Sequence, residues 1–140
     1  MTDLPDDAQT HPLKRRPQGA RQHRTAGPYS PVLVVEPQQL VVISGQVAVD
    51  LLGEVIGDTV EAQAEATLAN CARQLASASC GFADVFKVNI YLADLKDWAR
   101  FNKVYESKFK EPRPVRTAVQ AGLLPGILVE VEMWAVKAKE

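Results

Sequence analysis

The feature that most constrains the fold is an amphipathic pattern over residues 58–81. Apolar side chains recur there at intervals of three and four residues, at Val60, Ala64, Leu68, Cys71, Leu75 and Ala78. This spacing places them on one face of an α-helix. Asp58 can cap the start of the helix with Glu61 as its capping-box partner, and Gly81 is suited to end it. The pattern therefore predicts one long helix near the middle of the chain.

Strand patterns lie on both sides of this helix. Residues 32–36 and 40–46 are rich in β-branched side chains and are separated by a short Pro-Gln-Gln connection, which predicts a hairpin. Residues 84–92 alternate, with Phe86, Val88, Ile90 and Leu92 on one face and Val85, Lys87, Asn89 and Tyr91 on the other. The same period of two predicts further strands over residues 115–121 and 127–136.

A second helix is predicted over residues 97–109. Its apolar stripe consists of Trp98, Phe101, Tyr105 and Phe109, and the prolines that follow end it. The order is then ββαβαββ, which predicts an α+β fold with a single mixed sheet and both helices packed on one face. The other sheet face would carry Val85, Tyr91 and Ala118 beside charged groups. Because this surface is too apolar for water, we expect a homo-oligomer that packs sheet against sheet.

The composition favours one domain preceded by a tail. The chain has 140 residues, a net charge of −1 and a pI of about 6.1. This balance argues against a nucleic-acid-binding protein that relies on a global positive field. Residues 1–25 carry basic side chains and prolines without periodicity, so we expect a disordered tail there and a domain over residues 26–140. No apolar stretch is long enough for a secretory signal or a membrane span.

Histidine and cysteine are scarce, which excludes several kinds of site. His11 and His23 both lie in the expected tail, so the domain has no His-based catalytic triad and no His-ligated metal site. Cys71 and Cys80 are nine residues apart in one helical pattern and point to opposite sides, which argues against a disulfide. We therefore expect a cytoplasmic protein in a reducing environment.

One charged residue interrupts a predicted strand. Arg116 lies in the run Pro-Val-Arg-Thr-Ala-Val at residues 114–119. By alternation alone, one set of side chains would face the core and the other would face water: Val115, Thr117, Val119 and Ala121 inside, and Arg116, Ala118 and Gln120 outside. In the alternative, the Arg116 guanidinium lies at the floor of a pocket and binds a carboxylate or phosphate. The strand alone favours the first interpretation and leaves the second open.

Several motifs, taken together and in order, resemble the RidA/YjgF family of enamine/imine deaminases. They are AGPYSP at 26–31, ISGQVAVD at 43–50, GEVIGD at 53–58, the run at 84–109, PVRTAV at 114–119 and LVEVEMWAV at 128–136. The resemblance implies a chorismate-mutase-like α+β fold assembled as a homotrimer, with ligand pockets at the subunit clefts. It also implies hydrolysis of reactive 2-imino acids to 2-oxo acids and ammonia, without a cofactor or metal.

The resemblance carries four site residues onto this sequence. The arginine of the P-x-R-[ST] segment corresponds to Arg116, the tyrosine of G-P-Y to Tyr29, the glutamate of the last strand to Glu130 and the helical asparagine to Asn102. It implies that Arg116 grips the substrate carboxylate and that Glu130 orients water. Tyr29 would donate to the leaving nitrogen or close the pocket. From the residues alone, Tyr29 could equally pack at the first strand, and Glu130 and Asn102 could be surface residues.

The expected pocket wall departs from the family pattern at Ala118, Gln120, Gly122 and Leu123. These differences leave open a second hypothesis, a trimer that binds a 2-oxo acid or related metabolite without turnover. RNA cleavage is a third, which is disfavoured because the domain lacks the basic patch with interleaved aromatic residues that single-stranded nucleic acid requires. The expected partners are an imino acid substrate and further copies of the chain, with no nucleic acid and no membrane.

Overall fold

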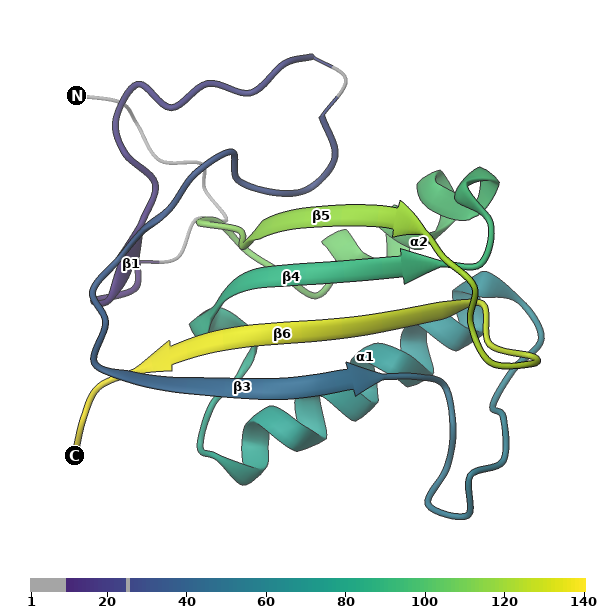
Figure 1. Cartoon of the computed structure of the whole chain (residues 1–140). Helices are drawn as coiled ribbons and strands as arrows, with labels where there is room; N and C mark the ends of the chain where they lie inside the picture. Colours follow the sequence, from purple (N-terminus) through teal and green to yellow (C-terminus); the bar gives the residue numbers. More distant parts are fainter. Residues whose placement is uncertain (1–9, 25) are drawn as a thin grey trace.

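A four-stranded mixed sheet carries both α-helices on the same face (Figure 1). The computed structural model describes residues 10–24 and 26–140. Across the sheet the strands are β3 (Gln39–Gln46), β6 (Val129–Lys137), β4 (Val85–Leu92) and β5 (Val115–Gln120). The helices are α1 (Val60–Ser77) and α2 (Trp98–Glu106), and short 3-10 turns, η1 (Phe82–Asp84) and η2 (Leu95–Asp97), precede β4 and α2. The predicted α+β class with one mixed sheet is confirmed.

The pairing of the strands places β5 at one edge. β3 and β4 both run antiparallel to β6, whereas β4 and β5 are parallel. A parallel pair needs a long crossover connection, and the segment that contains α2 supplies it. As a result α2 lies behind the β4–β5 side of the sheet, and α1 lies behind β3 and β6 (Figure 1).

The ends of α1 differ from those expected. Thr59 caps the helix in place of Asp58, because its Oγ1 accepts a hydrogen bond of 3.1 Å from the backbone N–H of Ala62. The helix ends at Ser77, since Ser79 adopts a positive φ of 61° that a helix does not allow. Gly81, expected as the C-terminal cap, is in an extended conformation.

The core lies between the sheet and the two helices. Its fully buried side chains come from every layer and include Leu68 and Leu75 of α1, Val88 and Ile90 of β4, Val131 and Met133 of β6, and Phe101 and Tyr105 of α2. Burial of one such aliphatic side chain contributes about 2 kcal/mol through removal of apolar surface from water. The apolar stripes predicted for the two helices therefore do face the sheet.

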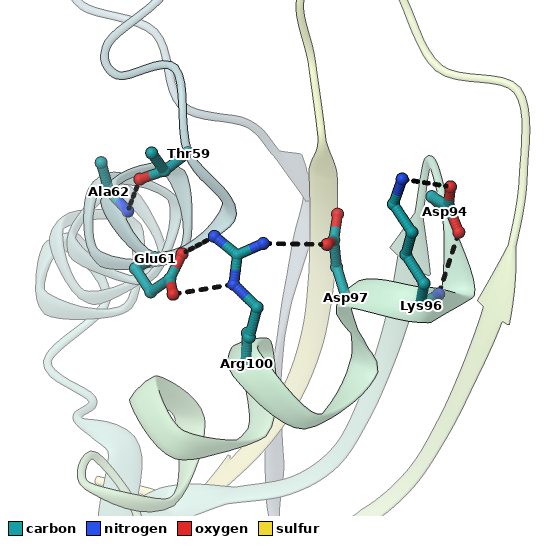
Figure 2. A network of polar contacts seen from close by, with 7 residues as sticks. All are labelled: Thr59, Glu61, Ala62, Asp94, Lys96, Asp97 and Arg100. Carbon is teal, nitrogen blue, oxygen red and sulfur yellow. Dashed lines mark hydrogen bonds and ion pairs between the residues drawn. The ribbon is translucent and has the colours of Figure 1, made fainter.

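A polar network fixes α2 against α1. Arg100 of α2 donates from Nε to Glu61 Oε2 at 2.8 Å and also binds the second carboxylate oxygen, and its Nη1 reaches Asp97 Oδ1 at 3.3 Å (Figure 2). The hydrogen bonds from Arg100 hold the pKa of Glu61 below its usual range. Because this fork joins the first turns of both helices, it sets the position of the α2 side chains that face the pocket described below.

The first two predicted strands do not form a hairpin. β2 (Val34–Val35) pairs antiparallel with β1 (Lys14–Arg15), and β3 pairs with β6 instead. The predicted order ββαβαββ describes β2 to β6 with the two helices, and β1 is an additional strand. The buried side chain of Leu13 and a 2.7 Å hydrogen bond from the Glu36 N–H to the Leu13 carbonyl hold β1 beside β2.

The segment over residues 11–16, which we call the N-terminal strap, is docked on the domain. Lys14 is 4% exposed, and its Nζ donates to the carbonyls of Val85 at 2.6 Å and Pro112 at 3.2 Å. His11 Nε2 lies 2.9 Å from Asp84 Oδ1. The expectation of a disordered tail is therefore wrong for the strap, because specific polar contacts hold it in the absence of any apolar period. Residues 1–9 of the expected tail lie outside the described residues.

The face of the sheet opposite the helices also differs in detail. A register shift between Val85 and Lys87 turns the Val85 side chain into the core, and Ala118 packs against the core as well. The exposed apolar side chains of this open face are instead Leu40, Val42 and Val119, of which Val42 is 59% exposed. Within the described ranges, no helix is long and apolar enough to cross a membrane.

Candidate functional site

Arg116 points to the helix-covered side of the sheet. It pairs with Val88, a core residue of β4, and is 9% exposed, whereas Thr117 and Val119 face outward. The side chains of β5 therefore alternate in the opposite sense to the one that its residues alone favour: Arg116 faces inward, and Thr117 and Val119 face outward. α2 lies over this edge of the sheet (Figure 1), and its side chains Trp98 and Tyr105 lie against Arg116.

Three aromatic rings surround the Arg116 guanidinium. Its Cζ lies 5.2 Å from the ring centre of Tyr29, 5.8 Å from that of Trp98 and 4.9 Å from that of Tyr105. These distances permit cation–π attraction. The Nε and Nη1 atoms are buried and have no hydrogen-bond partner among the residues that the structure describes. Burial lowers the pKa of this guanidinium, while Tyr105 and Tyr29 act in the opposite direction. A buried cation with free donors is suited to bind an anion.

The segment that carries Tyr29 is fastened along the edge of β5. Ser30 forms a parallel bridge with Val115, and its N–H donates to the Pro114 carbonyl at 3.1 Å. Next to it, Gly27 lies directly on the arginine and its rings. A Cβ at Gly27 would lie 3.1 Å from atoms of Trp98 and Tyr29 and 3.2 Å from Arg116 Nη2. A larger residue would push this segment away from the guanidinium.

A pocket of about 410 Å³ opens beside this cluster. Its lining comes from the segment between β1 and β2, from α2 and from the turn before β5: Ala26, Gly27, Pro28, Trp98, Ala99, Asn102, Lys103, Glu106 and Arg113. Asn102 is 7% exposed, and no described residue donates a hydrogen bond to its Oδ1. Arg116 is not itself part of the lining. It lies behind Gly27 and Trp98, and these two residues do line the pocket.

Glu130 lies elsewhere, on the open face of the sheet. It pairs with Tyr91 of β4, and its neighbours Val129 and Val131 face the core. In the described part of the chain its carboxylate accepts no side-chain hydrogen bond, whereas Glu132 accepts from Asn89 and Tyr91. The structure therefore brings Arg116, Tyr29 and Asn102 to one region and leaves Glu130 on the other side of the sheet.

Gly45 of β3 lies against Glu130. A Cβ built on Gly45 would overlap the Glu130 carboxylate, at 3.0 Å from its carbon and still closer to Oε2. The absence of a side chain at this position leaves room for the carboxylate over the β3 backbone. The carboxylate can meet water or a neighbouring molecule there.

The cysteines are buried and unpaired, as expected. Cys71 and Cys80 are free thiols, and burial raises the pKa of Cys71 to about 12. A thiol with so high a pKa is a poor nucleophile at neutral pH. Across residues 10–24 and 26–140, no group of three or more His, Cys, Asp and Glu side chains is arranged to hold a metal ion. The candidate chemistry therefore rests on Arg116 and the polar groups near it.

Sequence reasoning missed the residues that build the walls of the site. Trp98 and Tyr105 were expected only as part of an apolar helix stripe, and Gly27 and Gly45 were not singled out. One signal was present, since Trp98, Asn102 and Tyr105 are spaced by four and three residues and so share a face of α2. A polar side chain on such a stripe indicates a functional surface.

Comparison with known proteins identifies the family. The family model described as Endoribonuclease L-PSP matches residues 20–137. A RutC family protein of Pyrococcus abyssi is 35% identical over 113 residues, 79% of this chain and 87% of that protein. The 2-iminobutanoate/2-iminopropanoate deaminase of Homo sapiens is 34% identical over 113 residues, 79% of this chain and 81% of that protein.

Solved structures agree with this match. A member of the YjgF/YER057c/UK114 family from Mycobacterium tuberculosis superposes with a TM-score of 0.64 and 31% identity, over 78% of this chain and 86% of that one. The YjgF gene product of E. coli gives a TM-score of 0.65 at 30% identity, over 70% and 80% of the two chains. On the combined evidence of sequence and fold, this chain belongs to the Endoribonuclease L-PSP family, also known as the RidA/YjgF family.

Proposed function

We propose that the protein is a hydrolytic deaminase that converts reactive 2-imino acids and their enamine tautomers to 2-oxo acids and ammonia. The observation that carries the proposal is the Arg116 guanidinium, which is buried among three aromatic rings and has two donor atoms without a partner among the described residues. Such a group is suited to a planar carboxylate, the feature that all 2-imino acids share. The human relative named as an imine deaminase supports the same reaction class.

In this mechanism Arg116 binds the substrate carboxylate with two parallel hydrogen bonds. The adjacent imine carbon is then held in a fixed position, which lowers the entropic cost of attack by water. Water adds to the C=N carbon, the nitrogen takes up protons, the C–N bond breaks and ammonia leaves. Asn102 lies in the pocket wall and can bind the nitrogen, and Tyr29 closes the site against solvent. A protonated imine is electrophilic enough to react with water without a metal or a covalent nucleophile.

The position of Glu130 suggests that a neighbouring copy completes the site. Its carboxylate is on the open face and would orient the attacking water as a general base. Leu40, Val42 and Val119 make that same face partly apolar. We propose a homotrimer in which open faces pack together, so that Glu130 of one copy approaches the Arg116 pocket of the next. The free thiols of Cys71 and Cys80 support a cytoplasmic location.

The direct experiment follows imine hydrolysis. Threonine dehydratase releases 2-iminobutanoate, and the purified protein should accelerate the appearance of 2-oxobutanoate in that reaction. If 2-oxobutanoate binds but its formation is not accelerated, the protein is a metabolite-binding trimer and not an enzyme. Cleavage of RNA has less support, because Tyr29, Trp98 and Tyr105 are packed on Arg116 and are not free to stack on bases.

A further inference from the structure

Arg113 is a second arginine at the pocket, and the proposed mechanism does not use it. It lines the cavity together with Lys103, Glu106 and Asn102. Two of these four polar residues are cations and one is an acid. With Arg116 immediately behind Gly27, the surroundings of the pocket carry a net positive charge. An anionic ligand is therefore favoured beyond the one carboxylate that Arg116 accounts for.

The ion pair of Arg113 leaves part of its guanidinium unused. Arg113 Nη1 lies 3.0 Å from Glu111 Oε1, and the other oxygen of Glu111 lies 3.8 Å from Arg16 Nη1. One carboxylate is thus shared between two guanidinium groups, so the three side chains sum to a charge of +1. The Nε of Arg113 is buried and has no hydrogen-bond partner within residues 10–24 and 26–140. A charged donor of this kind is costly to leave unpaired.

Arg113 and Arg116 approach the same inner group. Burial raises the pKa of the Tyr105 hydroxyl, and the charges of Arg116 and Arg113, in that order, act against the rise. Both guanidinium groups are therefore close enough to the hydroxyl to influence it. In the described part of the chain, the Tyr105 hydroxyl itself is buried without a hydrogen-bond partner. Arg116, whose Cζ lies 4.9 Å from the centre of the Tyr105 ring, and Arg113, which lines the pocket, thus both act on this hydroxyl.

We propose that Arg113 binds a second acidic group, so that the preferred substrates are 2-imino dicarboxylates. This inference rests on the proposed function and specifies its substrate class. Arg116 would bind the carboxylate next to the imine, and Arg113 with Lys103 would bind the carboxylate of the side chain. The reaction is the same hydrolysis, in which water adds to the imine carbon, ammonia leaves, and a 2-oxo dicarboxylate is formed.

The test compares two imines that differ in the side-chain carboxylate. A flavin-dependent amino-acid oxidase generates 2-iminoglutarate from L-glutamate and 2-iminobutanoate from L-2-aminobutyrate, and semicarbazide captures the imine that the protein does not hydrolyse. The wild type should hydrolyse 2-iminoglutarate more efficiently. Arg113→Gln should reduce kcat/KM for 2-iminoglutarate about tenfold or more, through loss of one charge-assisted hydrogen bond, and leave 2-iminobutanoate nearly unchanged.

Two further variants make the result specific. Arg73→Gln removes an exposed guanidinium of α1 and should change neither rate. Arg113→Lys keeps the charge and should retain part of the preference, which also covers the case that Arg113→Gln fails to fold. Equal rates of the wild type on the two imines would overturn the proposal, as would an equal loss on both imines in Arg113→Gln.

A binding measurement separates this inference from the proposed function. If the wild type accelerates neither imine, the deaminase proposal fails, and calorimetric titration with 2-oxoglutarate and 2-oxobutanoate still tests Arg113. Tighter binding of 2-oxoglutarate that Arg113→Gln abolishes would support the second acid-binding residue. Equal affinity for the two oxo acids would overturn it.

Discussion

The guanidinium of Arg116 lies on the helix-covered face of the sheet, and the carboxylate of Glu130 lies on the opposite, open face. Arg116 pairs with Val88 of β4, whose side chain faces the core. Glu130 pairs with Tyr91 of β4, whose side chain points to the opposite face of the sheet. The backbone of the sheet separates the two side chains within one chain. A reaction that uses both groups therefore needs two copies, and this requirement makes the assembly part of the catalytic proposal.

The mass of the protein in solution tests whether it forms the proposed homotrimer. Sedimentation of the purified protein at micromolar concentration should give about three times 15.3 kDa. Val42→Asp places a charge on the open face, where Val42 is 59% exposed, and should shift the protein toward the monomer without unfolding it. A wild-type protein that sediments as a monomer would contradict the shared site.

Mixing two inactive variants tests whether the site is shared. Arg116→Ala and Glu130→Gln should each be nearly inactive alone. Trimers assembled from equal amounts of both should recover roughly a quarter of the wild-type activity, because a pocket then has an even chance of an intact residue from each of two copies. Activity would be measured after unfolding and refolding the mixture. If the mixed trimers remain as inactive as the parents, the two residues act within one chain or not at all.

Gly45→Ala tests the role of the Glu130 carboxylate without changing its charge. The added methyl group would overlap the carboxylate and displace it. We expect kcat to fall at least tenfold, as general-base catalysis typically contributes on the order of a hundredfold. The affinity for 2-oxobutanoate, measured by calorimetry, should remain within about twofold, because the Arg116 anchor is untouched. Unchanged kcat would show that the position of Glu130 does not matter.

Lys14 makes stability depend on pH in the alkaline range. Burial lowers the pKa of Lys14 from 10.5 to about 8. Between these values the unfolded chain holds a proton that the folded chain has lost, so the free energy of unfolding rises with pH. Urea denaturation of the wild type and of Lys14→Met should show the wild type gaining stability relative to the variant between about pH 7.5 and pH 9.5. The exposed Lys139→Met serves as the control. A constant difference between wild type and Lys14→Met would contradict the burial of this ammonium.

The sequence predicted the elements whose periodicity is strong and local. The stripe of α1, represented by Val60, Leu68 and Leu75, faces the sheet as expected. The predicted phase of β5 was wrong because alternation assigned the face with the polar side chains Arg116 and Gln120 to water, whereas Arg116 is buried. The choice depends on α2, which covers the side of Arg116.

The N-terminal strap could not be predicted from local patterns. Lys14 is held by the carbonyls of Val85 and Pro112, which are 71 and 98 residues away in the sequence. Such contacts have no signature in the strap itself. The same holds for the three aromatic rings around Arg116, since the segment with Gly27 and Tyr29 meets Arg116 only once it covers the edge of β5.

The most direct test is the effect of Arg116→Ala on imine hydrolysis. The variant should keep the mass and far-UV circular dichroism of the wild type but lose about a hundredfold or more of its kcat/KM for 2-iminobutanoate, because a buried charge-assisted pair is removed. Arg116→Lys should be nearly as damaging, since an ammonium cannot form the bidentate contact. Arg73→Ala, which removes an exposed guanidinium on α1, should be fully active. If Arg116→Ala hydrolyses 2-iminobutanoate at the wild-type rate, Arg116 does not bind the substrate carboxylate and the proposed mechanism is wrong.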